Sequence, residues 1–181
     1  MKKFLTFLLL VFIALLVAGL YGVVHDQISF TVSSEYFTKF KFRQFGLLGS
    51  PLPERLKVAI VGFLASWWMG IPIGVIIGLV ALIHRDSRRM FKVALDSFAL
   101  VTGLTLVIGL AGLGYGFYRT SSIDLAEYRS WFIPRGVTDL RRFLCAVYMH
   151  NASYLGGAIS IPVAIVFHVV RRNRSRRNET P

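Results

Sequence analysis

The chain has 181 residues, of which 55% are hydrophobic and only 17% are charged, and its formal net charge is +12. A soluble domain carries about 25% charged residues and a disordered chain has low hydrophobicity, so this composition excludes both classes. The single cysteine, Cys145, excludes an internal disulfide and a cysteine-based metal site.

The hydrophobic residues are concentrated in four blocks, each near or above the roughly 20 residues that a helix needs to cross a bilayer. The blocks cover residues 4–24, 56–83, 93–118 and 143–170. The sequence therefore predicts an all-α integral membrane protein, a single domain built as a bundle of four transmembrane helices. The first block also has features of a signal peptide, but it exceeds the about 7–15 apolar residues of a typical signal sequence, so we expect it to remain as a helix.

Lysine and arginine predict which way the helices run, because cytoplasmic loops of membrane proteins are enriched in them. Eleven of these cations fall in three short segments: the N-terminus, the inner loop 84–92 and the tail 171–181. We therefore expect both termini in the cytoplasm, with segments 25–55 and 119–142 outside. The five tail arginines should also bind anionic lipid headgroups; they are Arg171, Arg172, Arg174, Arg176 and Arg177.

The first outer segment allows two local structures. Apolar and polar residues alternate over residues 28–32 and again over 39–43, which is the period of a strand and favours a small hairpin within 26–50. A short helix that begins after Ser33 or Ser34, with Glu35 in its first turn, fits the middle of the segment equally well. Both interpretations stay open, and both give short interfacial elements on the periplasmic side.

Phenylalanines alternate with three cations in the same segment, Lys39, Lys41 and Arg43. This pattern suits a segment in the headgroup region, where the rings enter the boundary and the cations meet phosphates. The same residues can dock a partner protein, whereas an external location argues against nucleic acid. In the second outer segment, Asp124 at a helix N-cap and Glu127 three residues later predict a short interfacial helix that ends before Pro134.

Small residues recur every four positions in two of the blocks, which places them on one face of a helix. Such faces let two backbones approach closely, and close packing is what joins helices in lipid. We expect a compact bundle, with an interface between copies of the chain as the alternative. The expected packing residues are Gly62, Ser66, Gly70, Gly74 and Gly78 in the second block, and Ala152, Gly156 and Ser160 in the fourth.

Ionisable residues inside a membrane helix are costly and tend to face the bundle interior or a water pocket. His150 and Asn151 lie within the fourth block, and the first block ends on the same outer side with His25 and Asp26. A candidate polar cluster on the outer face therefore comprises His25, Asp26, Glu35, His150, Asn151 and Tyr154.

Several roles are open for this cluster. If the bundle brings them together, His25, Glu35 and His150 can ligate a divalent transition metal such as Zn²⁺, Cu²⁺ or Fe²⁺. His25 beside Asp26 can instead accept a proton near neutral pH. The alternatives are hydrogen bonds that hold the helices together, and a ligand pocket or partner contact. The sequence contains no zincin, Cys-x-x-Cys, phosphate-loop or dinucleotide motif.

Two segments of the chain resemble segments of small bacterial multi-pass membrane proteins for which no activity is established. The first is residues 25–42, HDQISFTVSSEYFTKFKF, and the second is residues 150–157, HNASYLGG. The resemblance covers 26 residues and implies a bacterial inner-membrane protein of the same topology. It assigns no functional residue, although it coincides with the two regions singled out above.

These observations give three functional hypotheses. The first is a non-enzymatic accessory or scaffold subunit that binds a membrane or periplasmic partner or a second copy of itself. The second is a metal-binding or proton-handling membrane protein built on the outer polar cluster. The third is a small transporter component, but the middle of the helices offers few polar groups for a path beyond Ser66, Thr102, Thr105 and Ser160.

Overall fold

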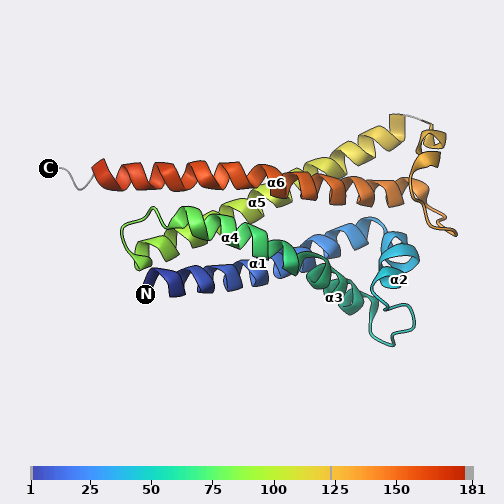
Figure 1. Ribbon diagram of the computed structural model, residues 1–181. Coiled ribbons are helices and arrows are strands. Elements are labelled where there is room, and N and C mark those ends of the chain that lie inside the picture. Colours follow the sequence, from blue (N-terminus) through green and yellow to red (C-terminus); the bar gives the residue numbers. More distant parts are fainter. Residues whose placement is uncertain (1, 123, 178–181) are drawn as a thin grey trace.

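The computed structural model describes residues 2–122 and 124–177, and within these ranges the chain is helical with no strand (Figure 1). Four spans there are long and apolar enough to cross a bilayer, as the sequence predicted, and they are helix α1, helices α3 and α4 together, α5 and α6. The long helices are α1 (Lys2–Val32), α3 (Glu54–Ser66), α4 (Gly70–Ala81), α5 (Ser87–Ser122) and α6 (Leu140–Arg177). The short ones are η1 (Tyr36–Lys41), α2 (Phe42–Gln44), η2 (Trp67–Met69) and η3 (Leu125–Ser130).

The spans run alternately up and down the bundle. The start of α1, the connection from α4 to α5 and the end of α6 lie at one end, and α2 and η3 lie at the other (Figure 1). Helix α1 packs mainly on α3 and α4, and α5 packs mainly on α6. The bundle therefore consists of two halves that meet along α1 and α5.

Small residues form the interface within the first half, where the chain passes from α3 to α4. The backbone of Gly62 lies directly against that of Gly22 in α1, and Ser66 reaches the same glycine. Further along, Gly70 and Gly74 contact α1 around Ala14, and Gly78 faces the ring of Phe7. The four-residue repeat therefore serves packing inside the chain.

The interface between α5 and α6 is built in the same way. The side chain of Ala152 fills the space above Gly112, and Gly156 lies against Thr105 and Ile108. The hydroxyls of Ser160 and Thr105 are 3.3 Å apart, so a polar contact joins the helices near their middle. Toward the end of the bundle where α1 begins, apolar residues from all four spans form one core cluster, which includes Leu10, Ile77, Met90, Phe98 and Ala164.

The second span is not one continuous α-helix. A turn of 3-10 helix, η2, separates α3 from α4. The break precedes Pro72, whose ring excludes the carbonyl of Trp68 four residues earlier and which has no N–H to donate. The proline therefore explains why the regular ladder stops there.

Of the two structures that the sequence left open for the segment 26–50, the short helix after Ser33 is present and the hairpin is wrong. Helix α1 continues to Val32 and is followed by the π-helix η1 and the short helix α2. The residues buried here are Tyr36 and Phe37, and then Lys41 and Phe42. The buried positions are five residues apart, from Tyr36 to Lys41 and from Phe37 to Phe42, which is the spacing of a π-helix hydrogen bond. Burial of these side chains therefore outweighs the alternating polar pattern.

The second outer segment contains the short helix that the sequence predicted, as the 3-10 helix η3. The carboxylate of Asp124 accepts a hydrogen bond from the N–H of Ala126 and so caps its start. Glu127 pairs with Arg119, at 3.4 Å. The hydroxyl of Tyr128 lies 3.0 Å from that of Tyr148 in α6, which fixes η3 against the bundle.

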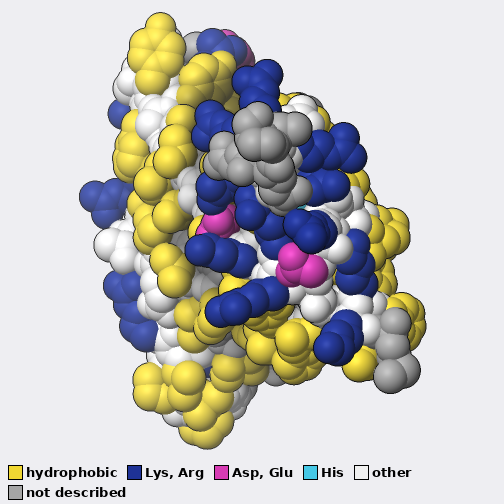
Figure 2. Space-filling model, turned by 90° about the vertical axis from the view of Figure 1, so that its left-hand side faces the viewer, with side chains coloured by type: hydrophobic (Ala, Val, Ile, Leu, Met, Phe, Trp, Pro, Cys, Tyr) yellow, Lys and Arg dark blue, Asp and Glu magenta, His cyan; other side chains and the backbone are white. Residues whose placement is uncertain are grey.

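The end of the bundle where α1 begins and α6 ends is densely covered by lysine and arginine (Figure 2). The residues predicted as a tail continue α6 as a helix to Arg177. Arg171 forms an ion pair with Asp96 of α5, at 2.6 Å, while Arg174, Arg176 and Arg177 are exposed and Arg172 is partly exposed. This end of the molecule is therefore strongly cationic.

Candidate functional site

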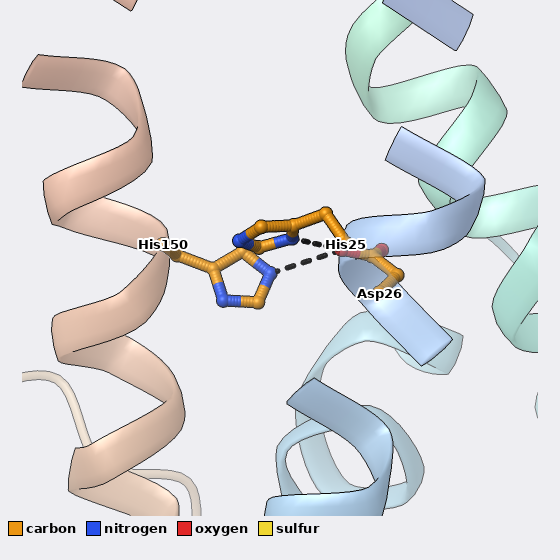
Figure 3. Close-up of side chains that lie close together, drawn as sticks. All are labelled: His25, Asp26 and His150. Carbon is orange, nitrogen blue, oxygen red and sulfur yellow. Dashed lines mark hydrogen bonds and ion pairs between the residues drawn. The ribbon is translucent and has the colours of Figure 1, made fainter. Parts of the chain in front are cut away.

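Three ionisable side chains meet between the two halves of the bundle, toward the end where α2 and η3 lie (Figure 3). His25 and Asp26 are adjacent in α1, and His150 comes from α6. Asp26 Oδ1 is 3.0 Å from His25 Nδ1 and 3.2 Å from His150 Nε2. All three are buried, with exposures of 4%, 4% and 8%. We call this group the His–Asp–His cluster.

The hydrogen bonds of the cluster fix where the protons of the two imidazoles lie. His150 Nδ1 is 2.9 Å from the carbonyl oxygen of Ala146, which can only accept, so Nδ1 carries a hydrogen. His25 Nδ1 donates in the same way to the Asp26 carboxylate. In neutral imidazoles both Nε2 atoms then present lone pairs, and neither has a hydrogen-bond partner among the described residues.

When both histidines are neutral, no proton therefore lies between His150 and Asp26. A lone pair on Nε2 faces a carboxylate oxygen at 3.2 Å, and the two atoms are not aligned for a hydrogen bond. Two electron-rich atoms repel each other in a low dielectric unless a positive species lies with them. The cluster therefore suits a bound proton or metal ion.

Aromatic rings surround the two imidazoles and hold their orientation. His25 and His150 pack edge to face with centroids 4.6 Å apart. Tyr36 of η1 covers His150 at 4.5 Å, and Tyr21, one turn before His25, lies 5.7 Å from the His25 ring. The cluster is thus rigidly placed and shielded from bulk water.

A cavity of about 110 Å³ adjoins the cluster and lies between the two halves of the bundle. All four spans and Lys41 contribute to its wall. Tyr21, His25, His150 and Ser153 all line it, and their buried Oη, Nε2 and Oγ atoms make no well-aligned hydrogen bond to a described residue, although the hydroxyls of Tyr21 and Ser153 face each other. Other unpaired buried atoms lie away from the cavity, so it is the space beside these four that makes room for a polar ligand.

Lys41 differs from the headgroup residue that the sequence predicted. Its side chain is only 8% exposed and lines the cavity, whereas Lys39 and Arg43 are exposed. Its ammonium lies 5.0 Å from the ring centre of Phe40 and 3.2 Å from Gln44 Oε1, to which it donates. Burial lowers the pKa of Lys41, and the negative charge of Asp26 partly opposes this shift.

Glu35 does not join the cluster, although the sequence grouped it with His25 and His150 as a metal ligand. Its carboxylate accepts hydrogen bonds from the N–H groups of Thr138 and Asp139, at 2.8–3.1 Å, just before α6. These backbone bonds, that of Asp139 first, lower the pKa of Glu35. Glu35 thus anchors the start of α6, and Asp26 is the carboxylate that meets the two histidines.

The other two candidates occupy the edges of the site. Tyr154 lines the cavity but is 55% exposed, so it lies where the cavity approaches the outer surface of the bundle. Asn151 is exposed and borders a separate groove beside Tyr36 and Trp131.

A second pair of histidines lies at the opposite end of the bundle. His84 and His168 are fully buried, with His84 Nε2 and His168 Nδ1 3.0 Å apart. Burial, and then the charges of Arg89 and Arg172, lower the pKa of His84. The pair links the α4–α5 connection to α6.

The chemistry of the His–Asp–His cluster fits a borderline or moderately hard metal ion. Two imidazole nitrogens and one carboxylate oxygen are common ligands of Zn²⁺, Cu²⁺ and Fe²⁺. One ligand atom from each residue lies within 4.8 Å of the others. Two bonds of about 2.0–2.1 Å span up to about 4 Å, so small side-chain movements suffice.

A hydrogen bond of the kind that orients metal ligands is present as well. The Nδ1–H of His150 donates to the backbone carbonyl of Ala146. Comparison of the sequence and structure with known protein families, curated proteins and solved structures gave no match, so the assignment of this site rests on its own geometry.

Proposed function

We propose that this protein is a multi-pass protein of a bacterial inner membrane with both termini in the cytoplasm. Four long apolar helices support insertion. The dense lysine and arginine cover at the end with the start of α1 and the end of α6 supports the orientation, since positive residues stay on the cytoplasmic side (Figure 2). Reporters fused to the C-terminus test it. A fluorescent protein should be active there and alkaline phosphatase inactive, and the reverse result contradicts the orientation.

We further propose that the protein binds a divalent transition metal ion at the His–Asp–His cluster. One observation carries this proposal: two imidazoles and one carboxylate meet in a buried site, with ligand atoms within 4.8 Å of one another. When His150 is neutral, its Nε2 lone pair lies 3.2 Å from Asp26 Oδ1. A metal ion would accept electron density from both atoms and so remove the repulsion between them.

A purely structural cluster is the alternative that this geometry disfavours. Polar residues that join membrane helices do so by satisfying one another's hydrogen bonds. The Thr105–Ser160 pair in the same bundle does this. The two Nε2 atoms of the cluster make no such aligned hydrogen bond, and both histidines also line a cavity.

The test is metal analysis of the intact protein purified in mild detergent. We expect about one zinc, copper or iron ion per chain, and a tetrahedral absorption spectrum when Co²⁺ is substituted. Asp26→Asn and His150→Ala should each weaken Co²⁺ binding by tenfold or more, because each removes a ligand, by the order of magnitude typical for metal sites. Asn151→Ala changes an exposed neighbour on the same helix and is the matched control.

The proposal fails if the wild-type protein binds no metal, or if His150→Ala and Asn151→Ala bind Co²⁺ equally. A proton is the second candidate, since the same 3.2 Å contact accommodates a protonated His150. If the cluster holds a proton, the wild-type protein should bind no metal. It should instead take up a proton, and Asp26→Asn should abolish this uptake. Metal binding alone does not identify a reaction. One role compatible with it is a metal-dependent accessory subunit, and affinity purification from native membranes tests this role.

A further inference from the structure

The buried pair of His84 and His168 lies at the lysine- and arginine-covered end of the bundle, and cations approach it from three helices (Figure 2). Lys3 of α1 donates from its ammonium to the backbone carbonyl of His84, at 2.5 Å. Arg172 follows His168 by four residues in α6, so it projects from the same face of that helix one turn further along. Arg89 lies in the first turn of α5, directly after the connection that carries His84. Three elements therefore bring one cation each to the same histidine.

The electrostatic surroundings of His84 agree with this placement. Burial lowers the pKa of His84, and the charges of Arg89, Arg172 and Lys3 lower it further. The carboxylate of Asp86 acts in the opposite direction, and it also accepts the backbone N–H of Arg89 at 2.9 Å. Three cations against one carboxylate leave a surplus of two positive charges around His84.

This surplus is not neutralised within the described part of the chain. The neighbouring Arg171 forms an ion pair with Asp96 at 2.6 Å, whereas Lys3, Arg89 and Arg172 form no ion pair with a described carboxylate. The Nδ1 atom of the fully buried His84 also lacks a hydrogen-bond partner there. Like charges close to one another repel, so an anion among these three cations would stabilise the arrangement.

We propose that Lys3, Arg89 and Arg172 form a binding site for a phosphate group. Guanidinium groups bind phosphate with two parallel hydrogen bonds, and an ammonium adds a compact positive charge. A phosphate monoester carries a charge of about −1.5 to −2 at neutral pH, which matches the surplus of two. Arg89 is exposed, and Lys3 and Arg172 are half-buried, so a ligand can reach all three from outside the bundle.

The site is distinct from the features already described. It lies at the opposite end of the bundle from the His–Asp–His cluster and needs no metal ion. The sequence predicted that all five tail arginines contact lipid headgroups, whereas the structure groups Arg172 with two cations of other helices. Two sources of the phosphate group share this chemistry: the head of a membrane lipid such as phosphatidic acid, and free phosphate from solution.

The first experiment titrates the full-length protein in a neutral detergent with phosphatidic acid or phosphatidylcholine and follows lipid binding by native mass spectrometry. One phosphatidic acid should bind at least about tenfold more tightly than phosphatidylcholine. Arg89→Gln and Arg172→Gln should each weaken this binding by about tenfold, as expected for the loss of a charge-assisted contact. The matched controls Arg88→Gln and Arg174→Gln remove exposed cations from the same two helices and should leave it unchanged.

The second experiment measures binding of radiolabelled inorganic phosphate to the same proteins by equilibrium dialysis. Binding that Arg172→Gln weakens and Arg174→Gln does not identifies free phosphate as a ligand, and selective binding of phosphatidic acid alone identifies a lipid. Either result supports the site. The proposal is overturned if phosphatidic acid and phosphatidylcholine bind equally and inorganic phosphate does not bind, or if Arg172→Gln and Arg174→Gln have equal effects. All four variants should bind Co²⁺ as the wild type does, so these results do not bear on the metal site.

Discussion

The close approach of α4 to α1 at Gly70 gives a prediction whose magnitude follows from the structure. A Cβ added to Gly70 would lie 2.5 Å from Leu15 Cα and 2.6 Å from the carbonyl carbon of Ala14. Ordinary contacts of this kind begin at 3.4 Å, so Gly70→Ala must separate the two backbones by nearly 1 Å. Overpacking of this kind costs about 1–3 kcal/mol.

Alanine also favours a helix over glycine by about 1 kcal/mol, and this gain partly hides the cost. Gly103→Ala is therefore the control, because it receives the same gain in an open position of α5. Gly103→Ala should be more stable than Gly70→Ala by about 1–3 kcal/mol, the overpacking energy itself. Unfolding of both proteins in mixed micelles with increasing dodecyl sulfate, followed by circular dichroism, measures the difference. Equal stability would refute the packing of these faces within one chain.

Three further predictions concern the ends of the bundle. Because Glu35 has a lowered pKa in the folded protein, its contribution of about 1 kcal/mol is present at neutral pH and is lost as the pH falls below about 4. The melting temperature of the wild-type protein should therefore fall over this pH range, and that of Glu35→Gln should fall less. His84 also has a lowered pKa, so the folded protein binds fewer protons than the unfolded chain, and stability should fall as the pH drops below about 6.5; His84→Phe should flatten that part of the melting profile. Tyr128→Phe removes the hydroxyl contact with Tyr148, and η3 should then be digested faster by protease added from outside, while Tyr118→Phe, at an exposed position, should not change the rate.

The spans could be predicted from the sequence because their signal is summed over twenty or more residues. The expected end of the first span, residue 24, was too early, since α1 continues through the polar residues His25, Asp26 and Gln27 to Val32. Polar residues do not end a helix that stays packed on its neighbours. The break at Trp67–Met69 was harder to predict from the sequence, because Pro72 indicates a distortion of the helix without fixing its position.

The site was predictable in part for a similar reason. His25, Asp26 and His150 stand out as ionisable residues in or beside apolar blocks, and their meeting needs only two helices to pack side by side. Glu35 was misplaced because its neighbours depend on the path of the chain after α1.

Three residues of the site were missed. Tyr21 precedes His25 by four residues and Ser153 follows His150 by three, so helical spacing could have added both. The burial of Lys41 had no such signal, because it follows from the five-residue repeat of η1, which an alternating pattern conceals.

The gathering of unpaired polar atoms around one cavity is what distinguishes the cluster from the rest of the bundle. Asp96 and Arg171 neutralise each other at 2.6 Å, and the hydroxyl of Thr120 donates to the carbonyl of Gly116 in its own helix. Burying a polar atom in a membrane protein costs free energy unless it is paired, although unpaired buried atoms also occur away from the cavity, on His84, Ser97, His168 and Arg171. At the outer cavity four of them are left without a partner, beside a carboxylate and a buried ammonium. The gathering of four such atoms beside one cavity, which the other unpaired atoms do not share, is explained if a ligand supplies the missing contacts.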